Sequence, residues 1–388
     1  MASIKTSALV VGGGMVGAAL AIGLARQGKQ VTVVDPQFVR HWQADSDYDL
    51  RISAVTNDNI QLLDELDVWQ HIRQLRVFPF TELAVSDTPR HWLELGDPNG
   101  AQPLGYMIEN KVLQHALFLV MEQQKNIHLL ESPLAQLSVT EKLATTDAGD
   151  IISFDMVFGC DGGQSRVRAA SGISVAGRDY GQRCLLSIVA TTEQVPMRTW
   201  ELFQGDEIHA LLPLANNFAC CIVYGNAREV SQWQQSHEQV AEVLKTRFAQ
   251  HIGDFNLQRF ASFPLIRQSA LRYVQTPTVL LGDAAHTIHP MAGQGVNLGF
   301  RDVKALLKAV AQHELNDESG LVQAFKHYER SRRLDNELMA HAMDAIGWSF
   351  QQEMKPIRAL RGLMLTGLQR FAPGRSAMTA YASGVWKL

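Results

Sequence analysis

The segment "ALVVGGGMVGAALAIGLARQGKQVTVVD", residues 8–35, carries the strongest indication of the fold. Ala8–Val11 is an apolar run of the length of a buried strand, and small and apolar residues follow it at helical spacing. Gly28 is placed to end that helix, because glycine readily takes the left-handed conformation found after helices. Val31–Val34 forms a second apolar run that ends at Asp35. The pattern predicts a strand, a helix and a parallel strand, which is the unit of an α/β sheet.

Three glycines between the first strand and the helix indicate what this unit binds. They form the pattern G-x-G-x-x-G, which gives a tight turn, a close approach of backbone to a pyrophosphate, and close helix–strand packing. The helix N-terminus offers N–H groups to phosphates, and an acid about 20 residues on binds a ribose diol. The acid disfavours a 2′-phosphate, so NAD and FAD both fit better than NADP. We therefore predict a dinucleotide site at Gly12, Gly14, Met15, Val16, Gly17 and Asp35.

The composition is that of a globular protein, with 46% hydrophobic and 19% charged residues among 388. This length suffices for two domains. A formal net charge of −4 argues against a nucleic-acid partner. We expect no signal peptide and no membrane-spanning helix, because the apolar runs are too short. The cysteines form no pattern and fit reduced thiols of a cytoplasmic protein: Cys160, Cys184, Cys220 and Cys221.

A second glycine-containing turn occurs in "DMVFGCDGGQSRVRAASG", residues 155–172. Its apolar start predicts a strand, and Asp161 and Gly162 begin a turn. Ser165 then opens a short helix that carries two arginines. Taken alone, the segment is as consistent with an ordinary strand–turn–helix and a solvated basic face as with a ligand site.

A third such turn is "GDAAHTIHPMAGQGVN", residues 282–297. Thr278–Leu281 predicts a buried strand, and Asp283 lies at its carboxyl end, where α/β sheets bind ligands. Gly293 and Gly295 precede an amphipathic helix whose N-terminus can hold a negative group.

Two histidines in this turn raise the question of a metal site. His286 and His289 are three residues apart and would share one face of a helix. However, Pro290 and the following glycines oppose a helix here, and no nearby Cys or Glu completes a ligand set. We therefore expect no metal, and we favour a packing or cofactor-wall role for both histidines over a role as a base.

The end of the chain is helical in pattern and basic. Residues 351–388 hold one acid, Glu353, and apolar residues between their basic ones. An amphipathic basic helix can lie on an anionic membrane surface. The alternative is a helix packed on the protein with its basic face in solvent. The basic residues are Lys355, Arg358, Arg361, Arg370, Arg375 and Lys387.

The three glycine-containing turns, in this order, resemble the FAD-dependent aromatic hydroxylases, or class A flavoprotein monooxygenases. The family's markers G-x-G-x-x-G, D-G-x-x-S-x-x-R and G-D-A-x-H-x-x-x-P-x-x-G-x-G-x-N occur at residues 12–17, 161–168 and 282–297. The resemblance covers nearly the whole chain. Within the family, "RISAVT" at residues 51–56 and "GYMIENKVLQHAL" at residues 105–117 are most similar to the ubiquinone-biosynthesis hydroxylases. These two segments are most similar in sequence to the hydroxylases that act on the methoxy-methyl ring late in the pathway. A related hydroxylase that acts at another ring position remains an alternative.

The resemblance implies an α/β fold (α+β overall) of the p-hydroxybenzoate hydroxylase type. A Rossmann-like FAD-binding domain then carries an inserted antiparallel sheet that binds substrate, followed by C-terminal helices. Alternating apolar residues and turn signals over residues 181–265 agree with this sheet, and residues 233–251 predict one amphipathic helix. The expected division is 1–75, 104–180 and 266–330 for FAD, 76–103 and 181–265 for substrate, and 331–388 for the helical region.

Roles at matching positions follow from the resemblance. Arg51 would lie near the flavin side of the pocket, and Asn110 stands where many members have arginine, so that only a hydrogen bond remains there. Asp161 and Gly162 would serve FAD and the approach of NAD(P)H. Asp283, with Gly282, would bind the ribityl or pyrophosphate part.

The flavin ring and the substrate would meet other residues. Pro290 would lie close to the isoalloxazine ring. Backbone N–H groups of Gly293, Gly295, Val296 and Asn297 would face flavin N1 and the C2 carbonyl. The pocket candidates are His289, Pro290 and Pro213, the last within an expected lining of residues 211–214.

The implied reaction is hydroxylation of a polyprenylated phenol or quinol in ubiquinone biosynthesis. NAD(P)H reduces FAD, and O2 then gives a flavin C4a-hydroperoxide that transfers oxygen to the ring. NAD(P)H would bind transiently, because there is no second G-x-G-x-x-G. No acid or base residue stands out. A peripheral place on the inner face of the membrane, or in a multi-enzyme complex, would suit the substrate. The alternatives are a flavin halogenase, an NAD-dependent dehydrogenase and a non-catalytic prenyl-binding protein of this fold.

Overall fold

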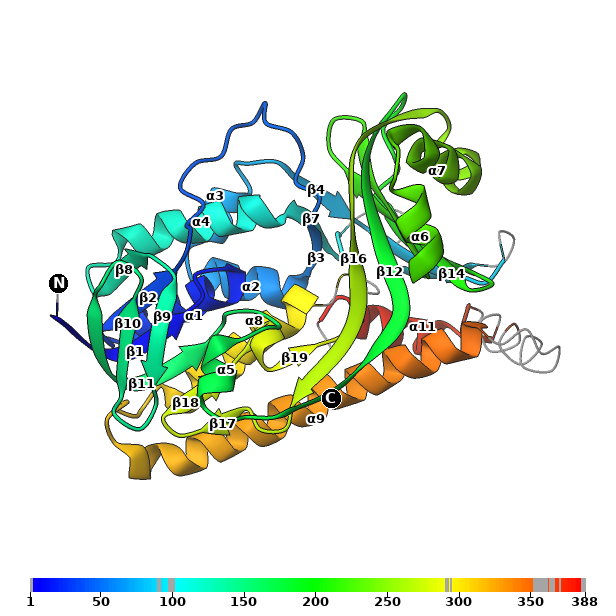
Figure 1. The fold of residues 1–388 in the computed structure, drawn as a ribbon. Helices are drawn as coiled ribbons and strands as arrows, with labels where there is room; N and C mark the ends of the chain where they lie inside the picture. Colours follow the sequence, from blue (N-terminus) through cyan, green and yellow to red (C-terminus); the bar gives the residue numbers. More distant parts are fainter. Residues whose placement is uncertain are drawn as a thin grey trace.

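The computed structural model describes residues 3–88, 92–96, 102–289, 293, 295–351, 362, 367–369 and 371–384. Figure 1 shows two halves side by side, with a largely parallel sheet in one and a long antiparallel sheet in the other. The helix α9 (Glu318–Gln351) runs beneath both halves. The predicted fold class, α/β and α+β overall, is confirmed.

The first half is built on a sheet in the order β17-β18-β11-β1-β2-β8, and β1 to β2, β2 to β8, β1 to β11 and β11 to β18 are parallel pairs. The predicted strands before each glycine-containing turn are therefore neighbours, and their carboxyl ends meet at one edge. The bounds are β1 (Ser3–Val11), β2 (Val31–Asp35), β8 (Ile127–Glu131), β9 (Leu134–Ser138), β10 (Leu143–Thr146), β11 (Ile151–Gly159), β17 (Val274–Gln275) and β18 (Thr278–Leu280).

The second half holds a sheet in the order β19-β16-β12-β15-β14-β13-β5-β6, antiparallel except where β13 pairs with β5. Its two longest strands reach back toward the first half (Figure 1), so they cross the expected domain limits at residues 180 and 265. The bounds are β5 (Glu82–Ser86), β6 (Trp92–Gly96), β12 (Val175–Thr191), β13 (Arg198–Gln204), β14 (Glu207–Leu214), β15 (Phe218–Asn226), β16 (Phe255–Ala270) and β19 (His286–Thr287).

A small sheet of three strands lies between the halves, in the order β3-β7-β4. Beside the parallel sheet, helix α1 contacts both α4 and α8. These elements are β3 (Ile52–Thr56), β4 (Val77–Phe80), β7 (Gly105–Glu109), α1 (Met15–Arg26), α2 (Asn57–Glu65), α3 (Trp69–Ile72), α4 (Asn110–Gln123), α5 (Arg166–Ala170), α8 (Gly295–Val310) and α11 (Ala372–Ala382).

Two helical boundaries differ from the sequence-based expectation. Residues 233–251 do not form one helix: α6 (Ala227–Trp233) ends and α7 (His237–Ile252) begins anew. The Ser236 side chain accepts a hydrogen bond from the backbone N of Gln239 at 3.1 Å and so caps α7. The expected division at residue 330 falls inside α9, because this helix already begins at Glu318.

The antiparallel sheet has two different faces. Leu211 and Val223 belong to a core that α6 and α7 close, whereas Leu212 and Ile222 face the opposite way. This follows from the alternation of side chains along a strand. The second face turns toward the small sheet and the first half, where the functional site lies.

Candidate active site

The first glycine turn is shaped partly by the protein and partly for a ligand. Gly12 has a φ of +98°, and a Cβ there would lie 2.3 Å from the carbonyl oxygen of Cys160. A Cβ at Gly17 would lie 1.8 Å from the Gly12 carbonyl oxygen. At Gly14 a Cβ would meet only one side-chain atom, at 3.9 Å, and no side chain caps α1. Packing therefore requires glycine at positions 12 and 17, while the space beside Gly14 is open to a ligand.

A cavity of about 370 Å³ adjoins this turn, and two aspartates line it. Asp35 Oδ2 accepts a hydrogen bond from the backbone N of Gly13 at 2.6 Å. Burial raises the pKa of Asp35, and such hydrogen bonds lower it by less. Asp161 Oδ2 accepts from the backbone N of Arg166 at 2.7 Å, whereas its Oδ1 is buried without a partner in the described ranges. A buried carboxylate oxygen without a donor fits a ligand hydroxyl or N–H group.

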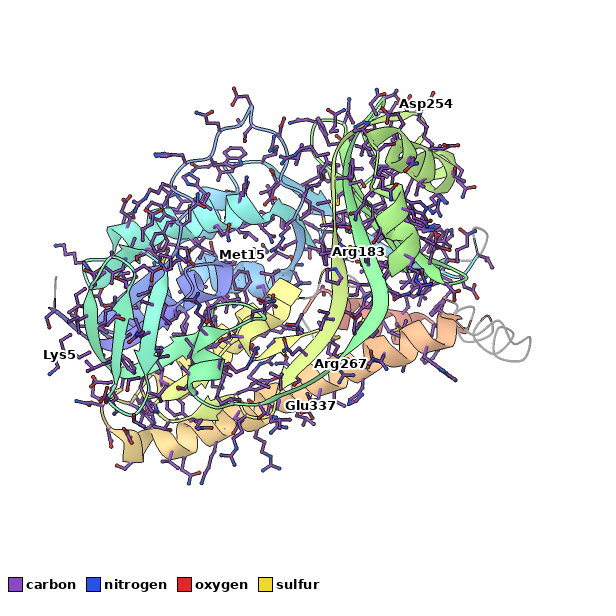
Figure 2. All side chains as sticks on the ribbon, viewed as in Figure 1. Lys5, Met15, Arg183, Asp254, Arg267 and Glu337 are labelled. Carbon is purple, nitrogen blue, oxygen red and sulfur yellow. The ribbon has the colours of Figure 1, made fainter. Side chains whose placement is uncertain are left out.

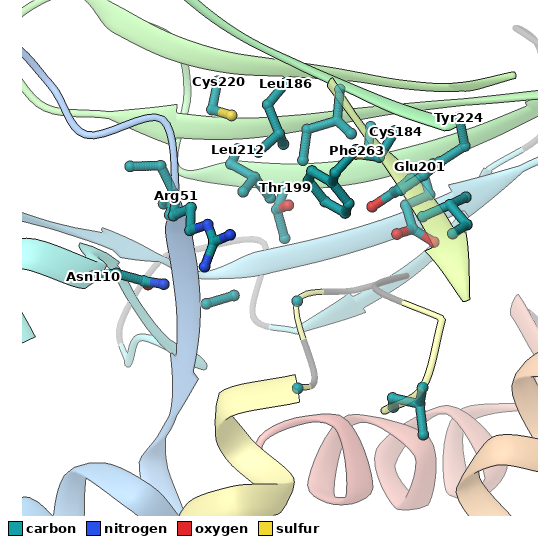
Figure 3. A pocket seen from close by; sticks show the side chains of 18 of the residues that line it. Arg51, Asn110, Cys184, Leu186, Thr199, Glu201, Leu212, Cys220, Tyr224 and Phe263 are labelled. Carbon is teal, nitrogen blue, oxygen red and sulfur yellow. The ribbon is translucent and has the colours of Figure 1, made fainter. Parts of the chain in front are cut away.

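A larger cavity, of about 700 Å³, lies between the two halves (Figure 3). One wall comes from the predicted motifs and includes Arg51, Asn110, Gln164, Asp283, Gly293 and Gly295. The other wall comes from the antiparallel sheet and is mostly apolar, with Cys184, Leu186, Ala210, Leu212, Ile222 and Phe263. Gln164 lines both cavities, so the two adjoin.

Arg51 and Asn110 enter the larger cavity from the edge of the small sheet (Figure 3). The Arg51 guanidinium makes no hydrogen bond or ion pair with any residue the structure describes. Asn110 Oδ1 accepts a hydrogen bond from Ser53 Oγ at 2.6 Å, which leaves its NH2 group as a donor. The pair offers positive charge and an amide to a ligand.

Asp283 follows β18 in a short 3-10 turn, Gly282–Ala284. Its carboxyl is exposed to the cavity, although protein atoms surround it on its other sides. Burial raises the pKa of Asp283, and His286 and Arg51 lower it. A carboxyl at the carboxyl end of a parallel strand is well placed to bind cofactor hydroxyls.

The N-terminus of α8 opens on the same cavity. Gly293 has a φ of +60°, and a Cβ there would lie 3.4 Å from Ala54. A Cβ at Gly295 would meet nothing within 4 Å. The first turn of α8 can therefore present its free N–H groups to a ligand edge.

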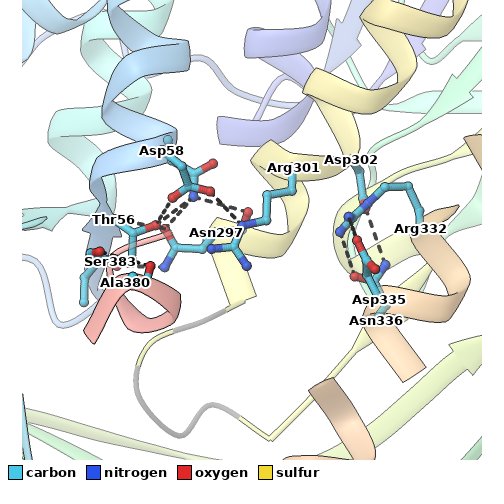
Figure 4. Close-up of polar contacts among 12 residues, drawn as sticks. Thr56, Asp58, Asn297, Arg301, Asp302, Arg332, Asp335, Asn336, Ala380 and Ser383 are labelled. Carbon is cyan, nitrogen blue, oxygen red and sulfur yellow. Dashed lines mark hydrogen bonds and ion pairs between the residues drawn. The ribbon is translucent and has the colours of Figure 1, made fainter. Parts of the chain in front are cut away.

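The side chain of Asn297 holds this helix end in place. It is fully buried, and its Oδ1 accepts hydrogen bonds from the Thr56 backbone N at 3.1 Å and from Asn59 Nδ2 at 2.9 Å (Figure 4). Its Nδ2 donates to the Ala54 carbonyl at 2.8 Å. Only the backbone N–H of Asn297 is left for a cofactor.

A buried ion network lies behind the third turn. Asp302 Oδ2 accepts a hydrogen bond from the Gly282 backbone N at 3.0 Å and pairs with His286 Nε2 at 2.6 Å. Its Oδ1 accepts from Arg332 Nε of α9 at 2.7 Å (Figure 4). Burial opposes ionisation of Asp302, but His286 and Arg332 outweigh it and hold its pKa at about 2. The network fixes the turn that carries Asp283.

Gln164 was not singled out from the sequence, and Arg168 entered only as the arginine of the D-G-x-x-S-x-x-R marker, without a role of its own. Arg168 is buried: its Nη1 donates to the Ala284 carbonyl at 2.8 Å and its Nη2 to the Gly163 carbonyl at 2.7 Å. It thereby ties the second turn to the third, so at this position the solvated-face interpretation is wrong. Gln164 could have been found from its place in a turn after a parallel strand.

The three pocket candidates are not among the described residues of the wall. His289 lies behind Tyr224, with their ring centroids 5.1 Å apart, and burial lowers its pKa to about 4. In β14, Ala210 and Leu212 face the cavity and Pro213 does not, because alternate residues of a strand face opposite sides. Pro290 lies outside the described residues.

Within the described ranges, no three His, Cys, Asp or Glu side chains are arranged to hold a metal ion. None of the helices in those ranges is long and apolar enough to cross a membrane. Of the basic C-terminal residues, Arg375 is described, and its Nη1 donates to the Gln369 carbonyl at 3.4 Å. The others, Lys355, Arg358, Arg361, Arg370 and Lys387, lie outside the described residues.

This arrangement fits FAD: an uncapped helix start beside Gly14, an Asp161 oxygen without a partner, and a second helix start at the larger cavity. Residues 5–341 match the family model described as FAD binding domain. The chain belongs to this FAD-binding family and is an FAD-dependent monooxygenase, as the three turns predict.

Relatives of the whole chain refine this class. The 3-demethoxyubiquinol 3-hydroxylase of Escherichia coli (strain K12) is 35% identical over 392 residues, covering 99% of this chain and 100% of that protein. The ubiquinone hydroxylase UbiL of Rhodospirillum rubrum is 32% identical, covering 98% and 90%. The p-nitrophenol 4-monooxygenase PnpA from Pseudomonas putida has the same fold, with a TM-score of 0.80 at 16% identity and full coverage of both chains.

Proposed function

We propose that the protein hydroxylates the aromatic ring of a polyprenylated quinol in ubiquinone biosynthesis, with NAD(P)H and O2 as co-substrates. The observation that carries this is one cavity of about 700 Å³ with a wall of cofactor-binding turns and an opposing apolar sheet face. Such a face suits a ring with a hydrocarbon tail. The 35% sequence identity with 3-demethoxyubiquinol 3-hydroxylase, which extends over 392 residues, supports this substrate class.

FAD, when bound, supplies the chemistry: it accepts hydride from NAD(P)H and activates O2. We assign its adenosine half to the smaller cavity and its ring to the larger one. The positive end of the α8 dipole would stabilise negative charge on the reduced ring. Leu186, Leu212 and Ile222 would keep water from the reacting ring. The assigned residues are Gly12, Gly14, Met15, Val16, Gly17, Asp35, Arg51, Asn110, Asp161, Gly162, Gly282, Asp283, Pro290, Gly293, Gly295, Val296 and Asn297.

The test is hydroxylation by the purified, FAD-loaded protein. With NAD(P)H and a short-chain demethoxyubiquinol, we expect a product that is one oxygen atom heavier by mass spectrometry. Isotopically labelled O2 should be its source. Bound FAD without any such product, across quinols that differ at each ring position, would refute the proposed activity. Comparison of NADH with NADPH in this assay identifies the reductant.

We further propose that the protein is cytoplasmic and binds the inner membrane surface through its basic C-terminal region. Support comes from the basic residues of 351–388 and from apolar side chains that α9 exposes, Leu334, Leu338 and Trp348, at 58%, 52% and 59%. Arg358→Gln with Arg361→Gln should weaken sedimentation with anionic liposomes and leave FAD content unchanged. Equal sedimentation of both proteins would reject this surface.

A further inference from the structure

We infer that Glu201 accepts a hydrogen bond from a ring hydroxyl of the quinol and serves as the base of the hydroxylation. This inference rests on the proposed function. It gives a chemical role to a side chain that neither the glycine-containing turns nor their spacing indicates.

Glu201 stands on the apolar wall of the larger cavity. It lies in β13, where Thr199, Glu201 and Phe203 share the face turned away from α6 and α7, and both Thr199 and Glu201 line the cavity (Figure 3). Its cross-strand neighbours are Ala210 on β14 and Val85 on β5. The small side chain of Ala210 leaves space beside the carboxylate.

The charge of this wall is concentrated at that one position. Among the described residues that line the cavity, the carboxyl groups are Glu201 and Asp283, and they come from opposite walls. Asp283 belongs to the turn assigned to the cofactor. Glu201 is half-buried between apolar neighbours, which strengthens a hydrogen bond to it compared with one in water. A carboxylate has about four lone-pair sites, so it can accept a further bond from a ligand whatever protein contacts it has.

The step balances without another reactant. As a ring carbon forms its bond to the incoming oxygen atom, the bond between the two oxygen atoms derived from O2 breaks and its electron pair stays on the other oxygen. At the same time the hydroxyl group passes its proton to a Glu201 oxygen, and the electron pair of its O–H bond moves toward the ring. The ring carbon then loses its own proton to the oxygen atom left behind, which is released as water, and aromaticity returns. Glu201 gives the first proton back to the ring oxygen. The oxygen atom and the reducing equivalents are those of the proposed reaction.

Other titratable groups face the same space and must be distinguished from Glu201. Tyr224 and Cys220 lie on β15, Cys184 lies on β12 of the same sheet, and Arg51 and Asp283 lie opposite. Burial raises the pKa of Tyr224 well above its ordinary value, to which Cys184 and Glu201 add, so the phenol is neutral at pH 7. The thiols of Cys184 and Cys220 are likewise protonated, because burial raises the pKa of each.

Glu201→Gln tests the inference, because it keeps the shape and removes the base. We expect quinol hydroxylation to fall about 100-fold or more in kcat, with little change in KM, FAD content or the FAD visible spectrum. The acidic limb of the wild-type pH profile should disappear. Glu201→Asp should recover part of the rate and keep that limb. Glu193→Gln, an exposed position in the same half, is the matched control.

Wild-type turnover is measured first, because its absence would refute the proposed function itself. If the wild type turns over and Glu201→Gln matches it in kcat and pH profile, the inference alone fails. If Glu201→Gln and Glu201→Asp are equally slow and both lose FAD, Glu201 has a structural role and the inference fails as well.

Discussion

The two walls of the larger cavity are built on opposite rules. On the cofactor side, residue type is fixed by the backbone, as at Gly293, whose φ of +60° favours glycine. On the sheet side, residue type is fixed only by which way a strand position faces, as for Leu211 and Leu212. Motifs therefore reveal the first wall, whereas the second becomes visible only when the register is known.

The largest loss of stability is expected from a substitution in the ion network behind the cofactor wall. Asp302→Asn should destabilise the protein by about 3 to 5 kcal/mol, because it removes the buried counter-charge of Arg332 and the acceptor of His286. Urea unfolding measures this. Asp335→Asn is the control, since Asp335 also pairs with Arg332 but its side chain is 51% exposed. Equal losses of unfolding free energy in the two variants would show that burial of the ion network contributes nothing to stability.

Within the glycine turn, two alanine substitutions should behave differently. Gly12→Ala should cost about 3 kcal/mol of folding stability, because its positive φ and the close Cys160 carbonyl leave no room for Cβ. Gly14→Ala should fold normally and bind FAD at least about tenfold more weakly. Thermal unfolding and flavin titration measure the two effects. Normal FAD affinity in Gly14→Ala would contradict the assignment of that open space to the pyrophosphate.

The sheet wall can be tested with adjacent leucines. Leu211→Ala should cost about 2 to 3 kcal/mol, because Leu211 is packed in the core under α6 and α7. Leu212→Ala should cost less stability and should raise KM for the quinol, since its side chain borders the cavity. Urea unfolding and steady-state kinetics separate them. The same stability loss with unchanged KM in both would refute the division of the two faces.

The smallest effect concerns an ion pair on the strand that carries Leu212. Burial opposes ionisation of Glu207, but Arg247 and His209 outweigh it and lower its pKa to about 2. The folded-state pKa is below the unfolded one, so this pair stabilises the protein above pH 4.5 and is lost as the pH falls toward 2. Glu207→Gln should cost about 1.5 kcal/mol at pH 7. The difference in unfolding free energy between Glu207→Gln and the wild type should shrink below pH 4.5. A difference that does not change with pH would argue against ionisation of Glu207 as its cause.

The sequence predicted what the backbone constrains. Asp161 and Asp283 were expected after parallel strands and line the two cavities. Glu201 was missed because a single acid within a strand has no distinctive spacing, whereas Gln164 could have been found from its place in a turn after a parallel strand. The break between α6 and α7 was predictable, because Ser236 and Gln239 form the S-x-x-Q capping pattern. The buried bonds of Arg168 were not, because they join turns more than 100 residues apart.

The length of α9 has a mechanical consequence. Its 34 residues span about 50 Å at the usual rise per residue, and the helix is anchored at two distant places. Arg332 holds it to Asp302 in the first half, and Asp344 accepts hydrogen bonds from Tyr180 and Arg267 on the long strands. Figure 2 shows Arg267 on the long strand above this helix. Arg332 and Asp344 lie 12 positions apart on α9, about 18 Å along the helix, so α9 joins the two halves and a hinge opening between them would have to break one of these ion pairs.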